Sequence, residues 1–186
     1  MFKKVLACAS LLASTLSALQ REDVVLSEEF LSPAWEQYDC HSSSLVQNAD
    51  GEILVVWKAG LGEGKSNFDI ASKVGIWQVR FDGKSWSDAE KVHFEPDTVV
   101  WNPVLGQLAS GELLLFFRAG AYPWLSTAFM KRSMDGGKVW SDPAYLPAGI
   151  VGPSKNKPLV LKDGTMLCPS STQVGDTDGI YPATAV

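Results

Sequence analysis

The sequence predicts an all-β protein assembled from a repeated unit, and three observations support this fold class. Gly51 to Gly60 reads G-E-I-L-V-V-W-K-A-G, and Gly111 to Gly120 repeats it as G-E-L-L-L-F-F-R-A-G, 60 positions further on. The turns before these segments place glycine between two apolar runs, which is a β-hairpin signal. The apolar residues are consecutive instead of spaced by three and four, so no convincing amphipathic helix is predicted. Repeats of this kind indicate an array of β units.

A weaker third copy of the phrase begins at Gly164, where the sequence reads G-T-M-L-C-P-S-S. Each copy is preceded by another short apolar segment, and that segment opens on polar residues. The opening residues are Asp39, His41 and Ser42 in the first copy, Asn102 in the second, and Lys155, Asn156 and Lys157 in the third. We therefore expect three units, over residues 39–96, 97–150 and 151–186.

The composition is that of a globular protein with one ordinary core. The chain has 186 residues, of which 46% are hydrophobic and 20% are charged, so it is too apolar to be disordered. The formal net charge is −5, and no run of basic residues occurs. Because nucleic-acid binding depends on a basic surface, we expect no nucleic-acid partner.

The first residues have the pattern of a targeting segment. Lys3 and Lys4 precede an apolar stretch from Val5 to about Leu19, with no acidic residue before Glu22. This pattern predicts a signal peptide over residues 1–18 and a secreted or extracytoplasmic protein. The alternative is an internal first strand or helix. The stretch is short for a membrane span, and residues 19–38 are expected to form a lead-in segment with an edge strand.

Cysteine and histidine are too sparse to predict a metal site. Without the leader, Cys40 and Cys168 remain; an oxidising compartment would permit them to pair, but we favour two buried, unpaired thiols. The chain has only two histidines, His41 and His93, and no close pair of cysteines. We expect no protein-ligated metal and no cofactor.

One turn carries a recognisable motif. Ser133-x-Asp135-x-Gly137-x-x-Trp140 resembles the Asp box of sialidase-like β-propellers, which are also called BNR-repeat proteins. In this pattern the aspartate accepts backbone N–H groups of its own turn, the glycine supplies a positive φ, and the tryptophan caps the sheet. Asp82 to Trp86 is a shorter copy. With other segments, among them Trp101-Asn102-Pro103-Val104, the resemblance extends from about Tyr38 to Thr172.

This resemblance implies a six-bladed β-propeller of four-stranded sheets. The chain supplies about three blades, so we expect a partial or truncated ring that corresponds to the N-terminal half of such a propeller. A compact sandwich of three units is the alternative.

The resemblance also implies a function, a sialidase-like exo-acting glycoside hydrolase that acts on an acidic sugar such as sialic acid. A non-catalytic carbohydrate-binding propeller fragment is the alternative, and either implies a carbohydrate or glycoconjugate partner. In a propeller, the polar residues that open the inner strands meet at the mouth of a central funnel, and cations there suit a carboxylate. The expected substrate-binding residues are Lys58, Asn102, Arg118, Lys155 and Asn156. A cation at a strand end can instead be a solvated residue that protects an edge.

The catalytic residues are less clearly indicated. The resemblance places the acid/base in the loop after the second strand of the first blade, where Glu63 and Asp69 are the acidic residues. His41 is a further candidate, since an imidazole with an ordinary pKa of about 6.5 transfers protons near neutral pH; the alternative is a structural hydrogen-bonding role. The chain lacks the Arg-Ile-Pro that opens the first blade of sialidases, and the tyrosine nucleophile would belong to the missing half.

Overall fold

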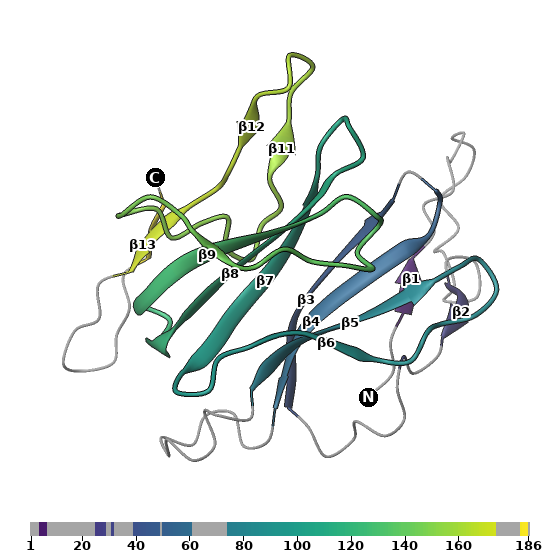
Figure 1. Cartoon of the computed structure of the whole chain (residues 1–186), viewed down its shortest axis with the longest axis horizontal. Coiled ribbons are helices and arrows are strands. Elements are labelled where there is room, and N and C mark those ends of the chain that lie inside the picture. The colour runs from purple at the N-terminus through teal and green to yellow at the C-terminus, as the bar shows by residue number, and fades with distance from the viewer. Residues whose placement is uncertain are drawn as a thin grey trace, which may run out of the picture. The chain divides into compact units, whose positions relative to one another are not determined.

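A computed structural model of the chain describes residues 4–6, 25–28, 31, 39–48, 50–60, 74–173 and 183–185 (Figure 1). Every regular element among these residues is a β-strand, which confirms the predicted all-β class. The chain divides into two compact units, Met1–Trp35 and Glu36–Val186. In the first unit, β1 (Lys4–Leu6) pairs antiparallel with β2 (Val25–Glu28). Apart from β1, the predicted signal peptide lies outside the described residues.

The second unit begins with two antiparallel four-stranded sheets of the same topology. The strands of the first sheet, in the order β3-β4-β5-β6, are β3 (Asp39–Gln47), β4 (Ile53–Gly60), β5 (Gly75–Phe81) and β6 (Glu90–Phe94). The strands of the second sheet, likewise paired in sequence order, are β7 (Val99–Gln107), β8 (Leu113–Tyr122), β9 (Leu125–Ser133) and β10 (Ala144–Tyr145). This meander is the topology of a propeller blade.

The third repeat unit, which follows the two four-stranded sheets, contains shorter strands. Two antiparallel pairs are formed, one by β11 (Leu159–Val160) with β12 (Met166–Leu167), and one by β13 (Ser171–Gln173) with β14 (Ala183–Ala185). The described residues therefore build two four-stranded blades and part of a third. No helix among them is long and apolar enough to cross a membrane.

The consecutive apolar residues of the repeated phrase are explained by burial on both faces of β8. Leu113, Leu115 and Phe117 lie in a core cluster together with residues of β4 and β5 from the first sheet. Leu114 and Phe116, which point the other way, pack in a second cluster with residues that include Met166 of the third unit. Side chains alternate between the two faces of a strand. A strand covered on both faces therefore reads as an uninterrupted apolar run.

The Asp-box turn has the predicted local structure. Asp135 Oδ1 accepts hydrogen bonds from the backbone N–H groups of Lys138 at 3.1 Å and Val139 at 2.9 Å, and from Ser133 Oγ at 2.8 Å. Gly137 has a φ of +88°. In the shorter copy, Asp82 Oδ1 accepts the N–H groups of the second and third residues after it, both at 2.8 Å. Both turns are therefore closed by an aspartate side chain.

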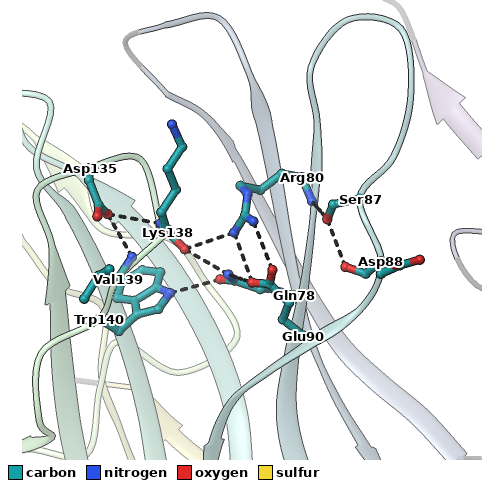
Figure 2. Close-up of polar contacts among 10 residues, drawn as sticks. Gln78, Arg80, Ser87, Asp88, Glu90, Asp135, Lys138, Val139 and Trp140 are labelled. Atoms are coloured by element: carbon teal, nitrogen blue, oxygen red, sulfur yellow. Dashed lines mark hydrogen bonds and ion pairs between the residues drawn. The ribbon is translucent and has the colours of Figure 1, made fainter.

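The tryptophan of the Asp box reaches beyond its own sheet. Trp140 Nε1 donates to Gln78 Oε1 of β5 at 2.9 Å, and Gln78 Nε2 donates back to the carbonyl oxygen of Gly137 at 2.8 Å (Figure 2). Arg80 pairs with Glu90 beside this contact, with 3.1 Å between Nη2 and Oε1. The turn thus joins the second blade to the first, whereas the motif predicted only a cap on its own sheet. The partner was not predicted because it lies in another repeat.

The cysteine side chains differ from the expectation. Cys40 and Cys168 are both exposed, so the prediction of buried thiols is wrong. Cys40 is the second residue of β3, and Cys168 directly follows β12, so both lie near strand ends, away from the apolar clusters.

Candidate functional site

The inner strands share an unusual backbone conformation near their beginnings. Ser42, Asn102 and Lys155 have φ values of 55°, 47° and 70°, and in the described part of the chain no other non-glycine residue has a positive φ. Ser42 and Asn102 occupy equivalent positions of the repeat, since the register of β3 with β4 shifts between His41 and Ser44, and that of β7 with β8 shifts between Trp101 and Val104. β3 and β7 therefore each carry a β-bulge that redirects their side chains, whereas Lys155 lies in the segment before β11.

The bulges are joined by polar contacts between units. Ser42 Oγ donates to Asn102 Oδ1 at 3.0 Å, and Asn102 Nδ2 donates to Ser154 Oγ at 3.4 Å. Further along β3, Ser44 Oγ accepts the backbone N–H of Leu105 at 3.0 Å. Asn102 is 8% exposed, so its amide is held between its two partners. Residues from three repeat units thus meet at one place: Ser42 and Asn102, which the sequence analysis named, and Ser154, which it did not.

A small open hollow lies at this meeting point. It has a volume of about 230 Å³ and is lined by Ser42, Ser43, Pro103 and Lys155. Complete small-molecule sites usually span roughly 300–1,000 Å³, so the hollow accounts for part of such a site. Its polar groups are two hydroxyls and an ammonium, and the Asn102 amide holds one of these hydroxyls in place.

The two cations at the ends of the repeated strands are buried. Lys58 is 1% exposed and Arg118 is 2% exposed, which excludes the alternative of solvated strand ends. The ammonium of Lys58 lies 3.9 Å from the ring centroid of Trp101 on β7, a cation–π contact between the two blades. Arg118 Nη1 donates to the carbonyl oxygen of Pro123 at 3.0 Å, and burial lowers the pKa of its guanidinium. Contact of either residue with a substrate stays a prediction.

The third unit contributes exposed polar side chains. Lys155 and Asn156 are both exposed, and Lys155 lines the hollow. Lys157 Nζ donates to the carbonyl oxygen of Leu45 on β3, and burial lowers the pKa of its ammonium. This contact links the third unit directly to the first blade.

Sequence reasoning missed three residues of this region. Ser43 and Pro103 line the hollow, and Ser154 accepts a hydrogen bond from Asn102. A signal was present, because each of them is adjacent to one of the positive-φ residues. A comparison of the residues that flank the equivalent positions would have identified them.

The predicted catalytic residues are placed only in part. His41 is exposed and lies directly before the first bulge, where it pairs in register with Lys58. Glu63 and Asp69 lie in residues 61–73, outside the described residues. In the part of the chain that the structure does describe, no three histidine, cysteine or acidic side chains are grouped as metal ligands. The acid/base assignment stays a prediction.

The repeats and the two blades agree with a known family. The sequence matches the family described as BNR repeat-like domain over residues 51–184, and the chain belongs to this family. A search of curated proteins finds no significant match.

Solved structures share the fold. A protein of unknown function from Dyadobacter fermentans is 18% identical, with a TM-score of 0.63 over 81% of this chain and 50% of that one. The Hadza microbial sialidase Hz136 is 16% identical, with a TM-score of 0.56 over 77% of this chain and 34% of that one. An endo-arabinase from Bacteroides thetaiotaomicron is 13% identical, with a TM-score of 0.56 over 88% of this chain and 60% of that one.

These likenesses establish the fold as a partial β-propeller of the sialidase type. The chain spans about half the length of the Dyadobacter protein and about a third of the sialidase.

Proposed function

We propose that this chain supplies a sugar-binding part of a sialidase-like, exo-acting glycoside hydrolase for an acidic sugar such as sialic acid. The observation that carries the proposal is a hollow lined by Ser42 of the first unit and Lys155 of the third, with Asn102 of the second unit bonded to Ser42 behind it. The hydroxyls of Ser42 and Ser43 suit the hydroxyls of a sugar, and the exposed ammonium of Lys155 suits a carboxylate. The sialidase and the endo-arabinase that share the fold support a carbohydrate as the ligand class.

Backbone strain supports a functional role for these positions. A non-glycine residue held at positive φ costs of order 1–3 kcal/mol, and such residues cluster at active sites and ligand clamps. Here the strain occurs in all three units, at residues that line or support the hollow. Glycine would remove the strain, but it would also remove the hydroxyl, amide and ammonium groups.

The alternative is carbohydrate binding without hydrolysis, and one observation favours it. Glycosidases commonly use a pair of acidic groups or a comparable acid and nucleophile. Among the described residues, the side chains that line the hollow include no carboxylate. Glu63 and Asp69 remain the candidates for this chemistry in the first proposal.

Two parallel measurements on the expressed chain separate these functions. The first is turnover of 4-methylumbelliferyl sialoside, and the second is calorimetric binding of N-acetylneuraminic acid. Asn102→Ala should abolish either signal, because it removes the amide that connects Ser42 and Ser154. Turnover would favour the hydrolase over the non-catalytic alternative, binding without turnover is compatible with both, and the absence of both signals would contradict the proposed sugar binding. Arg118→Ala tests the predicted role of a buried cation in the same assays.

We also propose that the protein is exported, since Lys3 and Lys4 precede an apolar stretch in the pattern of a signal peptide. The test is expression in a secreting host with mass spectrometry of the product. Cleavage near residue 18 is expected, and a secreted product that retains Met1 would contradict the proposed leader.

A further inference from the structure

The hairpin turn between β8 and β9 presents aromatic and aliphatic side chains to solvent. Tyr122 ends β8 and pairs in register with Leu125, the first residue of β9. The rings of Tyr122 and Trp124 are stacked, with centroids 4.8 Å apart and planes inclined by 10°. Tyr122 is 47% exposed and Leu125 is 66% exposed, whereas Trp124 is half-buried and covers one face of the Tyr122 ring. Exposed large apolar groups gathered in one place often mark a binding surface.

The turn is held by specific contacts. The carbonyl oxygen of Pro123 accepts a hydrogen bond from Arg118 Nη1 at 3.0 Å and another from Ser126 Oγ at 2.9 Å. Gly120 lies so close to the opposite strand that a Cβ atom there would come within 2.1 Å of the carbonyl oxygen of Leu125. The aromatic pair is therefore preorganised, which lowers the entropy lost when a ligand binds.

This turn lies at the same end of the blade as the bulge of Asn102. Val99, the first residue of β7, pairs with Gly120, so the turn extends beyond the beginning of the inner strand. Trp101 Nε1 donates to the carbonyl oxygen of Gly120 at 2.8 Å, and Trp101 directly precedes Asn102 in the chain. This hydrogen bond from a side chain to the backbone couples the turn to β7, the strand that carries Asn102.

We propose that the outer face of Tyr122, backed by the stacked ring of Trp124, forms a platform for a second sugar ring, next to the one bound at Ser42 and Lys155. This inference rests on the function proposed above and extends it, because it makes the ligand a glycan chain and not a free monosaccharide. Tyrosine and tryptophan offer large, rigid contact surfaces with a polar end, which suits the apolar C–H face of a pyranose that also carries hydroxyls. Sugar-binding pockets of this kind combine aromatic walls with a few polar groups.

The test compares ligands of two lengths, N-acetylneuraminic acid and the trisaccharide 3′-sialyllactose, by calorimetry. Trp124→Ala and Tyr122→Ala should each weaken trisaccharide binding by about 3- to 10-fold and leave monosaccharide binding unchanged, as expected for loss of one aromatic contact. Tyr145→Ala is the matched control, since Tyr145 is 74% exposed and lies on the outer strand β10. Saturation-transfer NMR should show the C–H protons of the lactose part in contact with the protein.

The outcomes separate this inference from the proposed function. If Asn102→Ala abolishes binding of both ligands while Trp124→Ala weakens neither, or weakens both equally, the platform is wrong and the sugar site stands. If the unmodified chain binds neither ligand, both proposals fail. If Tyr122→Ala changes only the oligomeric state in size-exclusion chromatography, the aromatic pair is a protein contact and the platform is again wrong.

Discussion

The indole nitrogen of Trp140 donates a hydrogen bond of 2.9 Å to the side-chain oxygen of Gln78, 62 positions earlier in the chain and in the neighbouring blade. Gln78 is 2% exposed and Trp140 is half-buried, so the amide of Gln78 is removed from water where the two groups meet. A buried polar group that loses its partner retains the penalty of its desolvation. The contact therefore has a direct consequence for the stability of the two-blade interface.

Gln78→Ala should lower the free energy of unfolding by about 1–3 kcal/mol, because it leaves the Trp140 N–H without its partner and the Gly137 carbonyl with only the longer bond from Arg80 Nη1, at 3.4 Å. Trp140→Phe should have a smaller effect of the same sign, since an aromatic ring is retained. Urea unfolding of both variants and of the double variant measures the coupling. Gln47→Ala is the matched control, because Gln47 is exposed and bonds only locally, to the Gly51 carbonyl at 3.0 Å. Equal losses for Gln78→Ala and Gln47→Ala would contradict the assignment.

Gly137→Ala and Gly83→Ala separate two effects of adding a methyl group. Both glycines have a positive φ, of +88° and +93°, so alanine is strained by roughly 1–2 kcal/mol at either position. At Gly83 a Cβ atom meets nothing within 4 Å, whereas at Gly137 it would lie 2.8 Å from Cδ2 of the fully buried Leu54. Gly137→Ala should therefore destabilise by about 1–3 kcal/mol more, as overpacking does. Thermal or urea unfolding measures the difference, and similar values for the two variants would argue against close packing between the blades.

Substitutions of Lys155 distinguish its charge from its backbone conformation. Lys155→Gly should raise the free energy of unfolding by up to about 1 kcal/mol, because glycine tolerates the φ of 70° without strain. Lys155→Ala retains the strain and should leave stability nearly unchanged. Both variants should weaken binding of N-acetylneuraminic acid in calorimetry, and Lys162→Ala, which removes an exposed lysine from the turn between β11 and β12, should not. Full binding by both Lys155 variants would exclude the ammonium as the carboxylate partner.

The second blade should lose stability in acid. Arg132 donates to both carboxylate oxygens of Glu112, with 2.9 Å between Nη2 and Oε2, and these bonds hold the pKa of Glu112 below its ordinary 4.5. Because the folded pKa is the lower one, this stabilisation is present above pH 4.5 and is lost as the pH falls through the folded value.

Arg132→Gln should therefore flatten the dependence of stability on pH below 4.5. Urea midpoints between neutral pH and acid measure it, with Lys138→Gln as a control that removes an exposed cation from the Asp-box turn. An unchanged acid dependence in Arg132→Gln would contradict this account.

The fold was largely predictable from local patterns. The repeated phrases became β4 and β8 because an apolar run bounded by glycines specifies a strand wherever both of its faces are covered. The Asp box specified its own turn, since the hydrogen bonds that Asp135 accepts all come from residues within a few positions of it. The partner of Trp140 could not be predicted, because Gln78 is reached only through the packing of one blade on another.

The site was predictable in its location more than in its contacts. Lys155 lines the hollow and Asn102 bonds to Ser42 of its wall, and both had been expected in this region because the repeat places them at the openings of inner strands. The burial of Lys58 was not predictable from its strand, since the ring that covers it belongs to Trp101 of the next repeat. The sequence of a strand does not show whether a cation at its end is buried by a neighbouring blade or exposed to water.

The order of Gln78 and Trp140 in the chain affects how the protein folds during synthesis. The first blade is synthesised before residue 140. Gln78 therefore leaves the ribosome before Trp140, the residue that donates to it, is available. The first sheet can pair its own strands at that stage. The face that packs against the second blade is covered only after the next repeat has been synthesised. Nascent chains arrested while Trp140 is still inside the ribosomal exit tunnel should therefore be less resistant to protease than chains arrested far enough downstream for Trp140 to have emerged.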